Sequence, residues 1–93
     1  MADVVIYRTQ YCPYCDLAER LFDRLGVEYN EIDVTHDAEE RARMVKMAGG
    51  KRTVPQIFIN GVSVGGYDSV SALHSNGKLE SMLQQEASPD SAD

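Results

Sequence analysis

The motif Cys12-Pro13-Tyr14-Cys15 holds the only two cysteines of this 93-residue chain, and its position restricts the fold. The apolar segment 4–7 before it is rich in β-branched and aromatic residues, which predicts a buried strand. Pro13 suits the first turn of a helix, and leucines that recur every fourth residue predict a helix over 13–25. A thiol between a strand and a helix lies at the helix N-terminus, where free backbone N–H groups and the helix dipole stabilise a thiolate. The motif therefore predicts a redox-active dithiol.

Other uses of two closely spaced cysteines fit the rest of the chain less well. A zinc site would need two further ligands, and both His36 and His74 are distant from the motif in the sequence. A structural disulfide is typical of secreted proteins, whereas the first residues show no secretory signal pattern. Disulfide exchange needs one attacking thiolate and a second thiol that resolves the mixed disulfide, and this spacing supplies both. We therefore expect redox chemistry and no metal.

Strand and helix patterns alternate along the remainder of the chain. Imperfect alternation over 27–34 predicts a second strand, parallel to the first, and Asp37 three residues before Glu40 is a capping-box-like helix start. We then expect a helix over 37–48, a strand over 56–59 and, after the hairpin signal Asn60-Gly61, a strand over 62–64. A helix capped by Asp68 or Ser69 and helical turns over 79–83 complete the pattern. The order predicts a small α/β domain with one mixed sheet.

Composition and charge limit the possible partners. The formal net charge is −6, which disfavours binding to nucleic acid because phosphates require a basic face. The longest apolar runs are only a few residues, so we expect no membrane span. With no signal pattern, the prediction is a cytoplasmic protein. We expect one domain over residues 1–83, followed by an acidic, disordered tail over 84–93.

Two further segments are candidates for a binding groove. In Thr53-Val54-Pro55 the proline precedes a strand, and a cis bond there would turn the Val54 backbone toward a bound thiol peptide; a plain turn proline is the alternative. In the segment 65–69, glycines permit close approach of a ligand and the following helix start can receive a carboxylate. The alternative for that segment is a hairpin exit followed by an ordinary helix cap.

Together the three segments resemble those of a glutaredoxin of the dithiol type. The similarity rests on Cys12-Pro13-Tyr14-Cys15, the run 53–59, and Gly65-Gly66 with Asp68-Ser69, in an order and spacing that fit over about residues 3–83. The resemblance implies a thioredoxin-like fold, in which a four-stranded mixed sheet (β-α-β-α-β-β-α) is flanked by helices. It also implies a cis bond at Pro55, glutathione as the electron donor, and disulfide-containing or glutathionylated proteins as substrates.

Site residues follow from the same resemblance. It implies that Cys12 is the nucleophile and Cys15 the resolving thiol. It places glutathione against Tyr14, Thr53, Val54, Pro55, Gly66, Tyr67, Asp68 and Ser69, with its γ-glutamyl end at the last four. The family usually has a lysine three residues before the first cysteine, and this chain has Thr9 there. Arg8, Lys51 and Arg52 are the candidate cationic contacts in its place.

Two alternative functions remain at this point. Some glutaredoxins bind an iron–sulfur cluster between two subunits, but a rigid Pro13 in the spacer disfavours that arrangement. A thioredoxin-like reductant fed by a flavoprotein reductase would have no use for the Gly-Gly-Tyr-Asp segment at 65–68. Nothing in the sequence suggests an obligate dimer, so we expect a monomer.

Overall fold

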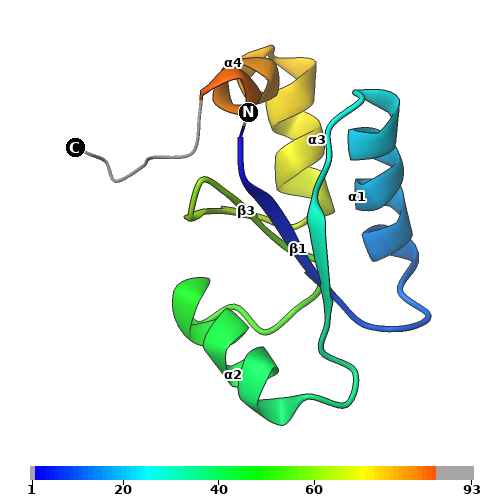
Figure 1. Cartoon of the computed structure of the whole chain (residues 1–93), viewed down its shortest axis with the longest axis vertical. Coiled ribbons are helices and arrows are strands. Elements are labelled where there is room, and N and C mark those ends of the chain that lie inside the picture. Colours follow the sequence, from blue (N-terminus) through cyan, green and yellow to red (C-terminus); the bar gives the residue numbers. More distant parts are fainter. Residues whose placement is uncertain (1, 86–93) are drawn as a thin grey trace.

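Four strands form one mixed sheet in a computed structural model that describes residues 2–85 (Figure 1). The strands are β1 (Val4–Arg8), β2 (Asn30–Asp33), β3 (Gln56–Ile59) and β4 (Val62–Gly65). Their order across the sheet is β2-β1-β3-β4. β1 pairs with β2 in parallel, and the β1–β3 and β3–β4 pairs are antiparallel. The predicted four-stranded mixed sheet is thus confirmed.

Helices cover both faces of this sheet. They are α1 (Pro13–Arg24), α2 (Ala38–Met47), α3 (Tyr67–Ser75) and the short α4 (Lys78–Gln84). Figure 1 shows α2 on the opposite side of the sheet from α1 and α3. This arrangement is the thioredoxin-like fold, with the final helical region divided into two helices at Asn76 and Gly77.

The alternation of side chains along β1 explains why both faces are buried. Val4 and Ile6 point to one face and join a cluster with residues of α1, α3 and α4. Tyr7 points to the other face and packs with Met44 of α2 and with Phe58 of β3. The Tyr7 and Phe58 rings meet edge to face, with centroids 5.6 Å apart. The two cores hold the end of β1, and hence the segment that follows it, in a fixed position.

The start of α1 matches the sequence prediction. Cys12 is the N-cap, and its sulfur accepts a bond from the Cys15 backbone N–H. The buried face of the helix is narrower than predicted: Ala18, Leu21 and Phe22 are buried, whereas Leu17 is 37% exposed. The helix therefore turns its Phe22 side to the sheet and leaves Leu17 at the edge of that contact.

The second strand is shorter than predicted because its first residues end the preceding helix. Gly26 has a φ of 71°, and its N–H bonds to the Asp23 carbonyl. The Val27 N–H bonds to the Phe22 carbonyl at 3.0 Å. These two bonds form a Schellman motif, which occupies the backbone of Val27. Pairing with β1 begins only at Asn30.

The predicted cap of α3 is wrong. Neither Asp68 nor Ser69 is the N-cap, because α3 begins at Tyr67 and its N-cap is Gly66, which offers no side chain. Asp68 and Ser69 instead lie in the first turn of the helix. The backbone N–H groups of this turn have no partner within the helix, which is the general condition of a helix start.

The C-terminal end of the described chain lies close to the predicted domain boundary. α4 extends to Gln84, one residue beyond the boundary expected at 83. The remainder of the predicted acidic tail, from 86 to 93, lies outside the described residues. Among residues 2–85, no helix is both long enough and apolar enough to cross a membrane.

Candidate active site

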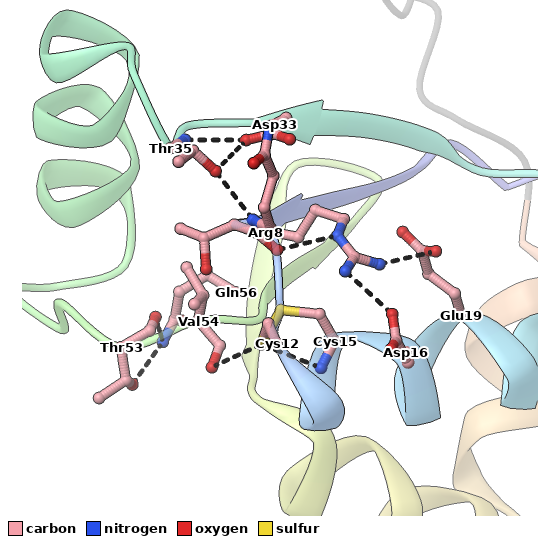
Figure 2. Close-up of a disulfide and its surroundings, with 12 residues drawn as sticks. Arg8, Cys12, Cys15, Asp16, Glu19, Asp33, Thr35, Thr53, Val54 and Gln56 are labelled. Atoms are coloured by element: carbon pink, nitrogen blue, oxygen red, sulfur yellow. Dashed lines mark hydrogen bonds and ion pairs between the residues drawn. A yellow bond between two sulfur atoms is a disulfide. The ribbon is translucent and has the colours of Figure 1, made fainter.

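Cys12 and Cys15 are joined by a disulfide at the N-terminus of α1 (Figure 2). Their Cα atoms are 5.2 Å apart. Cys12 is 9% exposed and Cys15 is fully buried, so Cys12 is the cysteine of the pair with access to solvent. The Cys15 N–H donates to the Cys12 sulfur at 3.2 Å. In the reduced protein this donor and the helix N-terminus favour the thiolate form of Cys12.

The loop before β3 lies directly beside Cys12, although it is 42 residues away in sequence. The Val54–Pro55 bond is cis, as the resemblance implied. The Cys12 sulfur lies 3.9 Å from the Val54 carbonyl oxygen. Figure 2 shows Val54 and Cys12 facing each other across this short gap. The backbone of Val54 is therefore within reach of a group bound at Cys12.

Gln56 is a site residue that sequence reasoning missed. It is 1% exposed, and its side-chain Nε2 donates to the Thr53 carbonyl at 2.9 Å and to the Thr53 hydroxyl at 3.3 Å. These bonds hold the loop that carries Val54. The sequence offered one signal for it: Gln56 is a polar residue at the start of an otherwise apolar strand. Buried polar groups are normally hydrogen-bonded, so a polar residue there indicates a specific bonding role.

A pocket of about 370 Å³ opens next to the dithiol. The residues that the resemblance assigned to glutathione all line it: Tyr14, Thr53, Val54, Pro55, Gly66, Tyr67, Asp68 and Ser69. Lys51 and Gln56 complete the lining. The Tyr14 and Tyr67 rings are stacked with centroids 6.4 Å apart, and so join the start of α1 to the start of α3. The structure thus brings three separate sequence segments together around one cavity.

Two glycines at the start of α3 stand where a side chain would meet Ser69 or the Pro55 loop. Gly65 has a φ of 96°, and a Cβ on it would lie 2.8 Å from the Ser69 hydroxyl oxygen. A Cβ on Gly66 would lie 3.3 Å from the Pro55 carbonyl oxygen. Any side chain at the first position would be both strained and obstructed. The pocket wall formed by α3 therefore depends on this pair of glycines.

The three candidate cations occupy different places. Lys51 lines the pocket. Arg8 does not, because its guanidinium bonds to Asp16 at 2.9 Å and to Glu19 at 3.0 Å, and Figure 2 shows it directed at these carboxylates. Arg52 lines a second cavity next to α2, where its carbonyl accepts a bond from Arg41. Of the three, Lys51 is the side chain placed to meet an anion in the pocket.

Glu19, one of the carboxylates around Arg8, has a raised pKa. Burial raises the pKa of Glu19, and the neighbouring Glu31 raises this pKa further. Arg8 opposes both effects, since its positive charge favours the ionised carboxylate. The Glu19 side chain is 16% exposed and that of Arg8 is 12% exposed. The cluster is therefore a partly buried charge network behind the dithiol helix.

Replacing Glu19 with glutamine is expected to change how stability depends on pH. A raised native pKa means that the folded protein binds more protons than the unfolded chain. The contribution of Glu19 is then fully present below its unfolded pKa of about 4.3 and is lost as the pH rises through its native pKa, which lies higher. Relative to Glu19→Gln, the wild type should therefore lose free energy of unfolding as the pH rises above about 4.3. Urea unfolding at a series of pH values measures this difference.

The matched control for that experiment is Glu28→Gln. Glu28 is exposed and lies outside the Arg8 cluster. A constant difference in unfolding free energy between wild type and Glu19→Gln across the whole pH range would contradict the expectation.

The fold and the site together define a thiol–disulfide oxidoreductase: a dithiol at a helix start, beside a cis-proline loop and a pocket. Among residues 2–85, no group of three or more His, Cys, Asp or Glu side chains is arranged to hold a metal ion.

Comparison with known proteins gives the family. The glutaredoxin family model matches residues 4–64. The chain is 46% identical over 83 residues to a glutaredoxin of Pseudomonas aeruginosa, covering 89% of this chain and 98% of that protein. The solution structure of a Brucella melitensis glutaredoxin superposes with a TM-score of 0.79 at 49% identity, covering 90% of each chain. The crystal structure of a buckwheat glutaredoxin–glutathione complex gives a TM-score of 0.80 at 38% identity, covering 88% of this chain and 76% of that one. The chain belongs to the glutaredoxin family and is a glutathione-dependent thiol–disulfide oxidoreductase.

Proposed function

We propose that Cys12 is the attacking thiol and Cys15 the resolving thiol. The Cys12 thiolate attacks one sulfur of a substrate disulfide, so that a bond to Cys12 forms and the second substrate sulfur leaves as a thiolate, which takes a proton. Cys15 then attacks the Cys12 sulfur, which releases the remaining substrate thiol and leaves the Cys12–Cys15 disulfide. Two electrons pass from the dithiol to the substrate. The difference in exposure between the two cysteines supports these roles.

In this proposal, glutathione occupies the pocket and returns the dithiol to its reduced form. The observation that carries it is the position of the Cys12 sulfur, 3.9 Å from the Val54 carbonyl that lines the pocket. The Val54 backbone pairs with the peptide groups of glutathione, and Tyr14 packs along one side. The unpartnered N–H groups at the start of α3 receive the γ-glutamyl carboxylate, as helix N-termini favour anions. Lys51 supplies the positive charge in place of the family lysine.

The physiological substrates in this proposal are disulfide-containing and glutathionylated proteins in the cytoplasm, and the enzyme acts as a monomer. The open face of the pocket beside Cys12 supports access by a polypeptide. The segment 66–69 lines the pocket, which favours glutathione as the donor over a thioredoxin-reductase-fed role.

A coupled assay tests the proposed electron donor. With glutathione, glutathione reductase and NADPH, the protein is expected to sustain steady reduction of the mixed disulfide between glutathione and 2-mercaptoethanol. The control replaces glutathione and its reductase with thioredoxin reductase, and should show no protein-dependent NADPH consumption. Turnover in the control, together with none in the glutathione system, would reverse the assignment.

A further inference from the structure

Tyr11 is the most exposed large apolar side chain of the described residues. It is 97% exposed, although it directly precedes Cys12. Its φ is 54°, in the left-handed region that an aromatic residue rarely adopts. An unusual backbone conformation at a non-glycine residue next to an active site is grounds for a functional hypothesis. An exposed aromatic ring held in this way needs an explanation beyond ordinary surface composition.

No packing role within the fold accounts for this tyrosine. The residue before a helix N-cap often packs against the fourth helical residue, in a hydrophobic staple. In α1 that fourth residue is Asp16, which is polar and bonds to Arg8 at 2.9 Å. A ring that is 97% exposed cannot pack on it to any useful extent. Tyr11 therefore contributes little to the helix that it precedes.

The loop that carries Tyr11 is nevertheless held in place. The backbone N–H of Gln10 donates to the Thr35 hydroxyl at 2.8 Å. The Thr35 N–H in turn donates to the Asp33 carboxylate at 2.8 Å, and Figure 2 shows these two residues bonded at the end of β2. The backbone of Tyr11 is therefore fixed by the hydrogen bond of Gln10 before it and by the start of α1 after it. Its ring is thus presented to solvent from an ordered support.

The position of Tyr11 relative to the pocket suggests what it contacts. Tyr11 adjoins Cys12 but does not line the pocket. Another exposed apolar side chain, Leu17 (37%), lies in the same short segment 11–17, whereas the exposed Tyr14 lines the pocket. A substrate polypeptide joined to the Cys12 sulfur extends in two directions, of which the pocket accommodates only one. The other direction leads away from the pocket, past residues that flank Cys12, and Tyr11 is the exposed side chain that directly adjoins Cys12 there.

We propose that Tyr11 is a docking residue for polypeptide substrates, and that it contacts an apolar side chain next to the cysteine under attack. The inference rests on the proposed function, because the substrate is the disulfide-containing polypeptide assigned there. Aromatic rings are the side chains that most often dominate protein contacts, since they bury a large area at a small entropic cost. The chemistry at Cys12 and Cys15 is unchanged, and Tyr11 affects only which polypeptides are bound well.

Paired peptide substrates test this role. Two disulfide-linked peptides of equal length carry either phenylalanine or glycine on both sides of each cysteine. We expect the wild type to prefer the phenylalanine peptide by about fivefold to tenfold in kcat/KM, the size of effect that one good apolar contact gives. Tyr11→Ala should reduce that ratio to near one, and Tyr11→Phe should retain it. Val62→Ala, which removes a side chain 59% exposed on β4, should also retain it.

The outcomes separate this inference from the proposed function. An unchanged ratio in Tyr11→Ala, or a ratio near one in the wild type, would overturn the docking role while the enzyme remains active. Turnover of the mixed disulfide of glutathione and 2-mercaptoethanol reports on the dithiol and the pocket without any peptide. Failure of the wild type in that assay would overturn the proposed function, and the docking role with it.

Discussion

Cys12→Ser is expected to abolish reduction of every disulfide substrate, with a loss of more than about 1,000-fold in kcat/KM. The serine hydroxyl is not ionised at neutral pH and cannot form the mixed disulfide through which the exchange proceeds. The other groups of the site, including the Cys15 N–H and the Val54 carbonyl, cannot replace the missing sulfur. The measurement is the coupled glutathione assay, repeated with a protein disulfide as substrate.

The control experiment for Cys12→Ser is to check that the variant folds normally. Cys12 is the N-cap of α1, and serine is a favourable N-cap residue, so Cys12→Ser should keep the helix. Unchanged far-ultraviolet circular dichroism and a similar Tm, measured against the reduced wild type, would show this. Substantial residual activity in a well-folded Cys12→Ser protein would mean that Cys15, although fully buried, is the attacking thiol.

Cys15→Ser is expected to separate two activities that the wild type combines. Reduction of glutathione mixed disulfides should persist, because a second glutathione can resolve the mixed disulfide on the more exposed Cys12. Direct reduction of protein disulfides should fall by at least about 100-fold, since it depends on a resolving thiol already held close by. The Cα atoms of the two cysteines are 5.2 Å apart, which places Cys15 for that step.

The two serine variants are best compared with one glutathionylated protein and one protein that contains an internal disulfide. The single change from sulfur to oxygen is the same in both variants, so each serves as the matched control for the other. Equal loss of both activities in Cys15→Ser would contradict the assigned roles. So would full retention of protein disulfide reduction.

Features governed by a few neighbouring residues were predicted well from the sequence. The N-cap position of Cys12, the strand Gln56–Ile59 and the turn at Asn60-Gly61 are present as expected, with positive φ at both turn residues. Turn chemistry and helix capping act over a few residues, so their signals are visible in the sequence.

Features that depend on competition between local contacts were predicted less well. Val27 was assigned to a strand, yet its N–H completes the end of α1. The cap of α3 was assigned to Asp68 or Ser69, but the helix starts earlier, at Tyr67, with Gly66 as its N-cap. Each segment allowed two hydrogen-bonding arrangements, and the sequence pattern did not distinguish between them.

The sequence did not predict which basic residue lines the pocket. Arg8, Lys51 and Arg52 were equivalent candidates because spacing along the chain does not give the direction of a long side chain. Arg8 is held by Asp16 of α1 and Glu19 of the same helix, and also lies 3.6 Å from Glu31 of β2. These carboxylates come from elements that only the folded sheet brings together. Lys51 remains as the basic residue that lines the pocket.

The sequence by itself determined the chemistry of the dithiol: two thiols, one at a helix N-terminus, with the order of elements needed for the fold. Only the tertiary structure decided what surrounds that dithiol. Val54 meets Cys12 from 42 residues away, Gln56 holds the loop that carries Val54, and Tyr11 remains exposed beside them. The physical reason is range: backbone preferences and capping act over a few residues, whereas a pocket is made by packing between distant segments.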